Sequence, residues 1–147
     1  MNKTDLAKIL SVSGQPGLYE YVAQARNGAI AEKLDNKKRV AFGSNAKITT
    51  LEDIAIYTSE GELRLAEVFN ALHATLGEED APGAKADSKT LEALFSKAIP
   101  NYDADRFYVS HMKKVVTWYN ELKQHASLDF MTQEEREAAY KAENEEA

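Results

Sequence analysis

Residues 101–105, Asn-Tyr-Asp-Ala-Asp, have the spacing in this chain that comes nearest to a metal-binding loop. Oxygen ligands at positions one, three and five begin the calcium loop of an EF-hand. The rest of that loop fails, because its sixth residue is Arg106 where Gly is needed and its twelfth is Met112 where Glu is needed. We therefore expect Asp103 and Asp105 to cap a helical turn and to pair with Arg106, and we predict no metal site.

The residue motifs of common catalytic sites are also missing from the sequence. His73, His111 and His125 are widely spaced and form no HxxxH pair, and no serine lies in a GxSxG sequence. The absence of cysteine excludes disulfides, thiolate metal sites and thiol catalysis. We therefore predict a protein that is not an enzyme and has no cofactor, and we expect a binding or adaptor module.

Aromatic side chains are the first candidates for binding a partner. Tyr19, Tyr21, Trp118 and Tyr119 carry amphipathic rings of the kind that is enriched in protein interfaces and in peptide-binding grooves. The alternative is that these rings form the edge of the core and only their polar atoms reach water. On the binding interpretation, the partner is another protein or a second copy of the chain.

Basic side chains suggest an alternative function, regulatory binding of RNA or DNA. Lys37, Lys38 and Arg39 fall on a predicted turn, while Lys113 and Lys114 begin a predicted helix close to aromatic residues. An ordinary polar turn and the solvated side of a helix would explain both clusters equally well. The net charge of −6 weighs against indiscriminate nucleic-acid binding, which depends largely on neutralising phosphates.

The elements that must position these residues begin with a β-rich segment. Residues 9–57 consist of short apolar runs interrupted by Gly, Pro and Asn, a pattern typical of a small curled antiparallel sheet. Residues 14–17, Gly-Gln-Pro-Gly, predict a tight turn, and Asn27-Gly28 predicts a type I′ hairpin. About five strands in some fifty residues predict an SH3-like small β barrel.

Helical periodicity takes over after Gly61. One helix ending at Gly77 is expected to close the barrel, giving a first unit at residues 1–77. Residues 78–86 are predicted to form a linker, residues 87–130 a helical hairpin interrupted at Pro100, and residues 131–147 an acidic, mobile tail. The predicted class is therefore α+β.

Length and composition limit the remaining possibilities. With 147 residues, of which 44% are hydrophobic, the chain can form one ordinary domain or two very small ones. No apolar run is long enough to span a membrane, and the run near the N-terminus is too short for a secretory signal. We therefore expect a cytoplasmic protein of bacterial type that does not associate with membranes.

Three segments of the sequence resemble a family of short uncharacterised bacterial proteins, a domain of unknown function. These segments are SGQPGLYEYV, LEDIAIYTSEGELRLAEVF and PNYDADRFYVSHMKKVVTWYNEL, and the similarity covers most of residues 6–125. The resemblance implies a two-part cytosolic protein, with an N-terminal block like a small β barrel and a C-terminal helical block. It implies no catalytic residue.

Overall fold

The computed structural model describes residues 3–15, 17–83 and 85–145. The described residues form seven strands, four α-helices and two short 3-10 turns, at Leu6–Lys8 and Leu51–Asp53. The elements in chain order are β1 Ile9–Val12, β2 Leu18–Ala25, β3 Gly28–Lys33, β4 Arg39–Gly43, β5 Ile48–Thr50, β6 Ala55–Thr58, β7 Gly61–Arg64, α1 Leu65–Leu76, α2 Ser88–Ala98, α3 Val109–His125 and α4 Gln133–Glu145.

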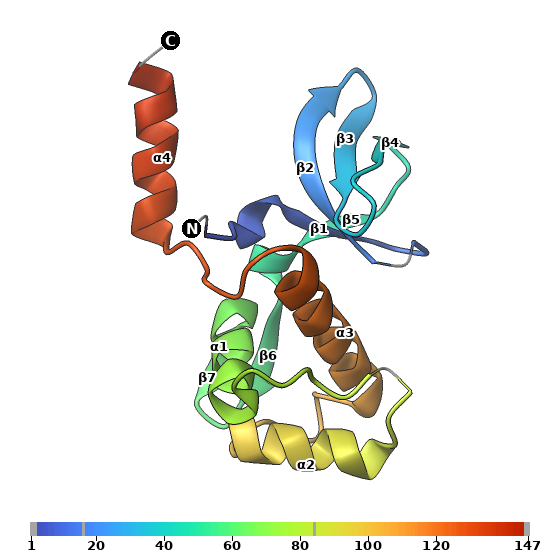
Figure 1. Cartoon of the computed structure of the whole chain (residues 1–147), viewed down its shortest axis with the longest axis vertical. Coiled ribbons are helices and arrows are strands. Elements are labelled where there is room, and N and C mark those ends of the chain that lie inside the picture. Colours follow the sequence, from blue (N-terminus) through green and yellow to red (C-terminus); the bar gives the residue numbers. More distant parts are fainter. Residues whose placement is uncertain (1–2, 16, 84, 146–147) are drawn as a thin grey trace.

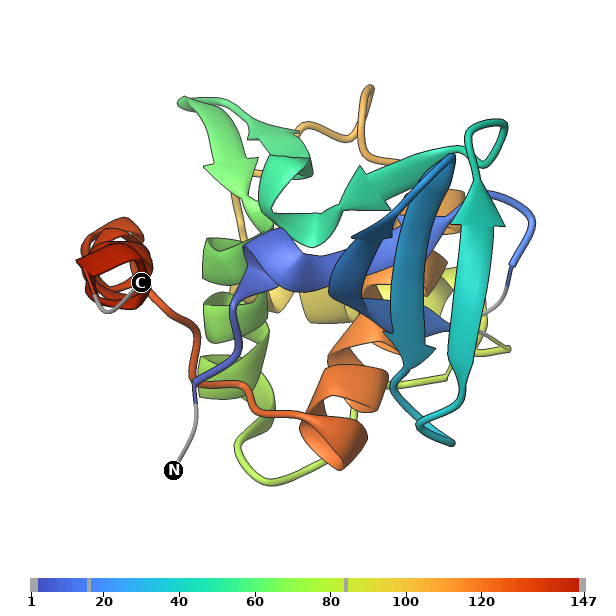
Figure 2. The ribbon, with the colours of Figure 1, turned by 90° about the horizontal axis from the view of Figure 1, so that it is seen from above.

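The first five strands form one antiparallel sheet in the order β4-β3-β2-β1-β5. The sheet curls strongly, as the view in Figure 2 shows. A register shift between Tyr21 and Ala23 marks a bulge in β2, and bulges of this kind bend a strand and increase its twist. Because of the curl, both faces of the central strands are covered: Ile9 and Leu18 face the helices, whereas Leu10 and Tyr19 face the inside of the curl.

The predicted SH3-like barrel is wrong, because the sheet is open. β4 and β5 form its two edges, and they are not paired with each other within the described residues. β5 has only three residues and leads directly into the 3-10 turn at Leu51–Asp53, which carries the chain away to the helices. The inside of the curl is filled instead by a small separate core made of Leu10, Val12, Tyr19, Ala31, Phe42, Ala46 and Ile48.

The β2–β3 hairpin differs from the predicted type I′ turn. Ala25 pairs with Gly28, so the two loop residues are Arg26 and Asn27. Neither has the positive φ that a type I′ turn requires. Gly28 is needed for another reason: a Cβ atom at this position would lie 1.8 Å from the carbonyl oxygen of Phe42 on β4.

The helical half is built on a two-stranded sheet, β6 and β7, of which β7 was not predicted. α1 ends at Gly77, which has a φ of 63°, and the Asp87 side chain caps α2 by accepting a hydrogen bond from the Thr90 N–H at 2.8 Å. The predicted helical hairpin is wrong, because α2 runs across the ends of α1 and α3 (Figure 1) and packs on both of them. The segment between α2 and α3 is hydrogen-bonded to the β6–β7 hairpin, because the Asn101 carbonyl accepts from the Ser59 N–H and the Asp103 N–H donates to the Tyr57 carbonyl.

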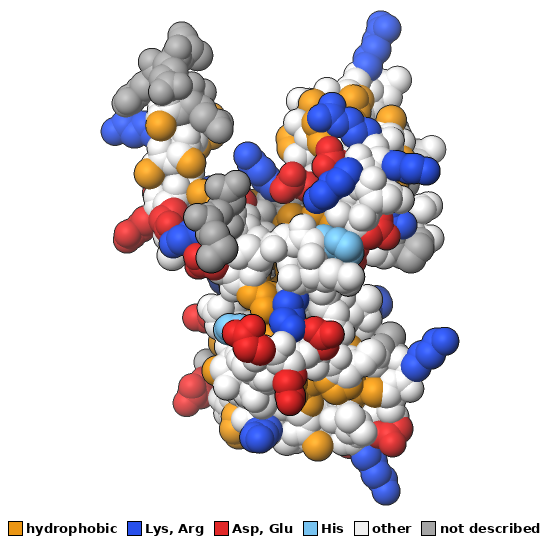
Figure 3. Space-filling model, in the orientation of Figure 1, with side chains coloured by type: hydrophobic (Ala, Val, Ile, Leu, Met, Phe, Trp, Pro, Cys, Tyr) orange, Lys and Arg blue, Asp and Glu red, His pale blue; other side chains and the backbone are white. Residues whose placement is uncertain are grey.

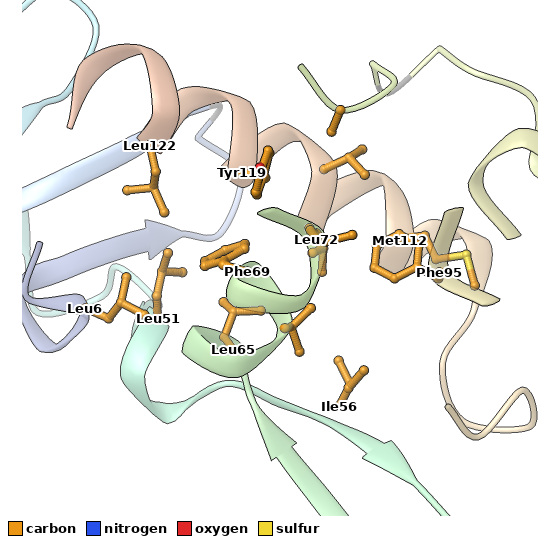
Figure 4. Packing of buried hydrophobic residues seen from close by; sticks show 14 of the residues in the cluster. Leu6, Leu51, Ile56, Leu65, Phe69, Leu72, Phe95, Met112, Tyr119 and Leu122 are labelled. Carbon is orange, nitrogen blue, oxygen red and sulfur yellow. The ribbon is translucent and has the colours of Figure 1, made fainter. Parts of the chain in front are cut away.

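One apolar core joins the sheet to the helices. Phe69 on α1 lies near its centre, with its ring 6.2 Å from that of Tyr119 on α3, and Figure 4 shows the surrounding residues from both halves of the chain. Ala81, inside the predicted linker, is buried and exchanges hydrogen bonds of 2.8 and 3.0 Å with the Asn120 amide. The division into units 1–77 and 87–130 stays a prediction, but the core extends through both ranges.

Residues 133–145 of the predicted mobile tail form helix α4, which stands apart from the rest of the molecule in Figures 1 and 2. Residues 146–147 of that prediction lie outside the described residues. Arg136 anchors the helix through ion pairs of 2.7 Å to Asp5 and 3.2 Å to Glu52. Within the described part of the chain, no helix is both long and apolar enough to cross a membrane.

Candidate functional site: a groove between β6 and α3

A cavity of about 310 Å³ lies between strand β6 and helix α3. We call it the β6–α3 groove. The helix contributes side chains at spacings of three and four residues, which place them on one stripe of α3. The lining is mostly apolar and consists of residues 54–57, Arg106, Phe107, His111, Lys114, Val115 and Trp118.

The edge of β6 that faces away from β7 is only partly paired. In an antiparallel ladder, alternate residues direct their N–H and C=O groups to opposite neighbours. The Ile54 carbonyl accepts from Leu65 beside β7, whereas the Tyr57 carbonyl accepts from the Asp103 N–H at 2.9 Å on the other side. The N–H and C=O groups of Ala55 point to the same side as those of Tyr57, and among the described residues no backbone group pairs with them. A short stretch of strand edge is therefore open along the groove.

Two cationic side chains, Arg106 and Lys114, and the imidazole of His111 line the groove. The Arg106 guanidinium lies 4.9 Å from the centre of the Tyr57 ring and 3.6 Å from the Asp103 carboxylate. His111 Nδ1 accepts a hydrogen bond of 3.2 Å from the Tyr108 N–H, which leaves Nε2 to donate. Lys114 is exposed and has no carboxylate within ion-pair distance in the described ranges. The rim therefore favours a negatively charged group.

Aromatic rings form much of the groove and its margin. Phe107 is buried and stacks on His111 with 6.3 Å between ring centres. Tyr57 and Tyr108 keep 40% and 56% of their surface exposed, and Trp118 is half-buried on α3. Exposed aromatic rings beside an arginine are the composition that is enriched at protein-binding surfaces.

The structure separates the four aromatic residues that were predicted to bind a partner. Tyr19 is buried in the small core, where it packs edge-to-face on Phe42 at 5.1 Å, and Tyr119 is fully buried with its hydroxyl 3.4 Å from His73 Nδ1. The burial of Tyr19 and Tyr119 agrees with the alternative interpretation, in which these rings belong to the core, and not with contacts to a partner. Tyr21 is exposed on β2, and Trp118 lines the groove. The two accessible rings do not share a cavity.

The two predicted basic clusters are not brought together either. Lys37 lines a different cavity beside α4, Lys38 is exposed on the same turn, and Arg39 lies 3.6 Å from Glu32. Lys114 lines the β6–α3 groove, whereas the neighbouring Lys113 does not. Nucleic-acid binding by these residues stays a prediction, and no shared basic surface supports it.

In the segment with calcium-like spacing, Asp103 pairs with Arg106 as expected, whereas the expected pairing of Asp105 with Arg106 is not observed among the described residues. One carboxylate oxygen of Asp103 accepts the Asp105 N–H at 3.0 Å, and the other lies 3.6 Å from Arg106. Asp103 therefore fixes the loop that brings Arg106 over Tyr57. Over the described ranges, no group of three or more His, Asp or Glu side chains could hold a metal ion.

Glu121 is the one carboxylic acid on α3, and it lies outside the groove. Its side chain accepts the Leu18 N–H at 3.1 Å and so connects α3 to the start of β2. Burial raises the pKa of this carboxyl above its ordinary value, and the hydrogen bond from Leu18 only partly offsets that effect. Its position between the helices and the sheet indicates a structural role.

Of the residues that line the groove, Trp118 and Lys114 were already candidates from the sequence, whereas Arg106, His111 and the edge of β6 were not. The sequence did contain a signal that these α3 residues lie on one face of the helix. It is their spacing of three and four residues, at His111, Lys114, Val115 and Trp118. The signal was incomplete, because nothing in the local pattern shows that β6 lies opposite this stripe.

Each half of the chain matches a known protein-family model. Residues 6–51 match the domain of unknown function DUF5606, and residues 54–122 match the domain of unknown function DUF6852. The second match includes all the residues that line the β6–α3 groove. The two matches meet at the 3-10 turn before β6.

A solution NMR structure from Bacteroides vulgatus, a Northeast Structural Genomics Consortium target, is similar to the chain over almost its whole length. It is 34% identical, the match covers 87% of this chain and 98% of that one, and the TM-score is 0.69. None of the curated proteins compared with the chain matches it. The chain therefore belongs to the same family as this Bacteroides vulgatus protein, and in this chain a DUF5606 match is followed by a DUF6852 match.

Proposed function

We propose that this protein is a binding module that takes a short, extended peptide segment with an acidic group into the β6–α3 groove. The open edge of β6 beside a mostly apolar hollow is the observation that supports this proposal most directly. A peptide added to a strand edge gains main-chain hydrogen bonds, and the hollow beside the edge accepts alternate side chains. At 310 Å³ the cavity is at the small end of ligand sites, so only a short part of the peptide enters it.

The charges indicate which peptides fit. Lys114 and His111 lie on the helix side of the groove, and Arg106 lies over the ring of Tyr57. A carboxylate on the peptide would meet Lys114, which is without an ion pair, while apolar residues would contact Trp118 and Val115. The predicted ligand is therefore a segment in which aliphatic or aromatic residues adjoin Asp, Glu or a terminal carboxylate.

A library of random linear peptides displayed on phage tests the proposal with the full-length chain as bait. We expect enrichment of peptides that combine apolar and acidic residues. Their synthetic forms should bind in fluorescence anisotropy, and in NMR titrations they should shift the amide signals of residues 54–57 and of α3 at His111, Lys114 and Trp118. Methylation of alternate peptide nitrogens should abolish binding, because it removes the donors that pair with the strand edge.

Lys114 and Lys113 provide a matched pair of variants on one helix. Both lysines are exposed, but only Lys114 lines the groove. Lys114→Glu should weaken peptide binding by about tenfold or more, since a charge-assisted contact contributes roughly 1.5–3 kcal/mol, whereas Lys113→Glu should leave binding nearly unchanged. Equal losses in the two variants, or a library with no enriched peptide, would show that the groove is not a peptide site.

A further inference from the structure

Helix α4 has few contacts with the rest of the molecule. The chain that leads to it is held by Thr4, whose carbonyl accepts from Met131 and whose N–H donates to Asp129. Beyond the ion pairs of Glu135 with Lys3 and of Arg136 with Asp5 and Glu52, no hydrogen bond or ion pair joins the described side chains of α4 to the body. A free helix of this length is only marginally stable in water.

A cavity of about 810 Å³ separates α4 from the sheet. We call it the α4 groove, and Figure 3 shows open space between the helix and the sheet on this face of the molecule. Ala139 and the largely exposed Tyr140 line the helix side. The opposite wall includes Lys8, Glu20, Leu34, Lys37 and His125.

Helix α4 and the wall opposite it differ in net charge, although the α4 residues that line the groove are Arg136, Ala139 and Tyr140. Residues 133–145 contain five glutamates against Arg136 and Lys141. On the opposite wall, Lys3 and Asp5 are paired with Glu135 and Arg136 of α4, and the remaining charged side chains are Lys8, Lys37 and Glu20. Neither Lys8 nor Lys37 has a carboxylate within ion-pair distance in the described part of the chain. An acidic helix would therefore complement this wall.

We propose that the chain forms a two-fold symmetric dimer in which α4 of each copy lies in the α4 groove of the other. A second copy carries the required occupant, an acidic helix with an exposed tyrosine, and it also offers an identical groove in return. A two-fold interface uses the same surface on both partners, so one set of contacts satisfies both helices. The arrangement covers Tyr140 and places the glutamates of α4 opposite Lys8 and Lys37.

Light scattering on a size-exclusion column tests the dimer with the full-length chain. The expected mass is twice 16.4 kDa at high protein concentration and low salt, with dissociation as the salt concentration rises. The double variant Lys8→Glu/Lys37→Glu should elute as a monomer with an unchanged circular dichroism spectrum. The control Lys38→Glu/Lys47→Glu makes the same change in charge at exposed positions of the sheet outside the α4 groove, and it should remain dimeric.

A charge swap distinguishes the proposed pairing from a general effect of charge. Glu134 and Glu137 have no ion pair with the body, so Glu134→Lys/Glu137→Lys should also give a monomer. Mixing this variant with Lys8→Glu/Lys37→Glu should restore a dimer that contains one copy of each. The proposal is overturned if the natural chain is monomeric at millimolar concentration, if the control pair also dissociates, or if the mixture does not associate.

Discussion

Gly28 and Gly43 face each other across the β3–β4 ladder, but their surroundings are opposite. A Cβ atom on Gly28 would lie 1.8 Å from the Phe42 carbonyl oxygen and 2.8 Å from the Phe42 carbonyl carbon, whereas a Cβ atom on Gly43 would meet nothing within 4 Å. Neither glycine has a φ in the left-handed region. The backbone conformation therefore permits alanine at both positions, and only the contact with Phe42 distinguishes them.

The structure indicates how large the difference should be. In Gly28→Ala the Phe42 carbonyl must withdraw by more than 1 Å to reach even a close contact distance of 3.0 Å. This movement separates β4 from β3 at the end of the ladder. The overpacking costs about 1–3 kcal/mol and each weakened ladder hydrogen bond about 1 kcal/mol, so we expect a loss of roughly 2–4 kcal/mol. Gly43→Ala should be neutral or should stabilise the protein by up to about 1 kcal/mol.

Urea unfolding followed by the fluorescence of Trp118, the single tryptophan, measures both changes. Amide hydrogen exchange should show β4 losing protection in Gly28→Ala and keeping it in Gly43→Ala. If Gly28→Ala were as stable as the natural chain and kept its protection on β4, the close approach of the two strands would be refuted. Equal destabilisation by both substitutions would instead indicate a general sensitivity of this edge of the sheet.

Two further predictions concern side chains of α3 that join distant parts of the chain. Glu121→Gln keeps an acceptor for the Leu18 N–H but removes a carboxylate whose pKa is raised by burial. Because the pKa is raised in the folded state, the ionised carboxylate destabilises the natural chain once the pH rises above that pKa. The variant should therefore be the more stable protein at pH 7. The expected gain is at most about 1 kcal/mol, because solvent screens this partly exposed group. Denaturant midpoints should converge as the pH falls, and a gap that does not change with pH would contradict the assignment. Asn120→Ala leaves the N–H and carbonyl of the buried Ala81 without partners, so it should lower the free energy of unfolding in urea by about 2–3 kcal/mol. The Ala81 amide hydrogen should also exchange faster. The control Asn70→Ala, at an exposed position, should change stability little.

Local signals in the sequence predicted most of the elements. Short apolar runs between turn residues predicted strands close to β1 to β4, and Gly77 and Asp87 marked a helix end and a helix start. These predictions depend on residues that are near one another in the chain. The class α+β followed from them and is confirmed. β7 was missed because residues 61–64 are short and mostly polar, and the hairpin partner that defines the strand is β6.

Predictions that needed contacts between distant residues were the ones that failed. Five short strands are compatible with a closed barrel, but closure depends on whether β4 meets β5, and the three-residue β5 ends before it can do so. The helical hairpin failed because residues 101 and 103, between α2 and α3, are hydrogen-bonded to the β6 hairpin. Tyr19 has an amphipathic ring in sequence, but the curl of the sheet buries it.

The sequence by itself determined that this chain has no cysteine chemistry and no complete calcium loop, because those features depend on residue type and spacing alone. It also determined where most strands and helices lie. Tertiary structure alone decided that Lys114 and Trp118 face the open edge of β6 and that Arg106 lies over Tyr57. A groove between a strand and a helix some fifty residues apart is set by the packing of the whole core, and no local pattern encodes it.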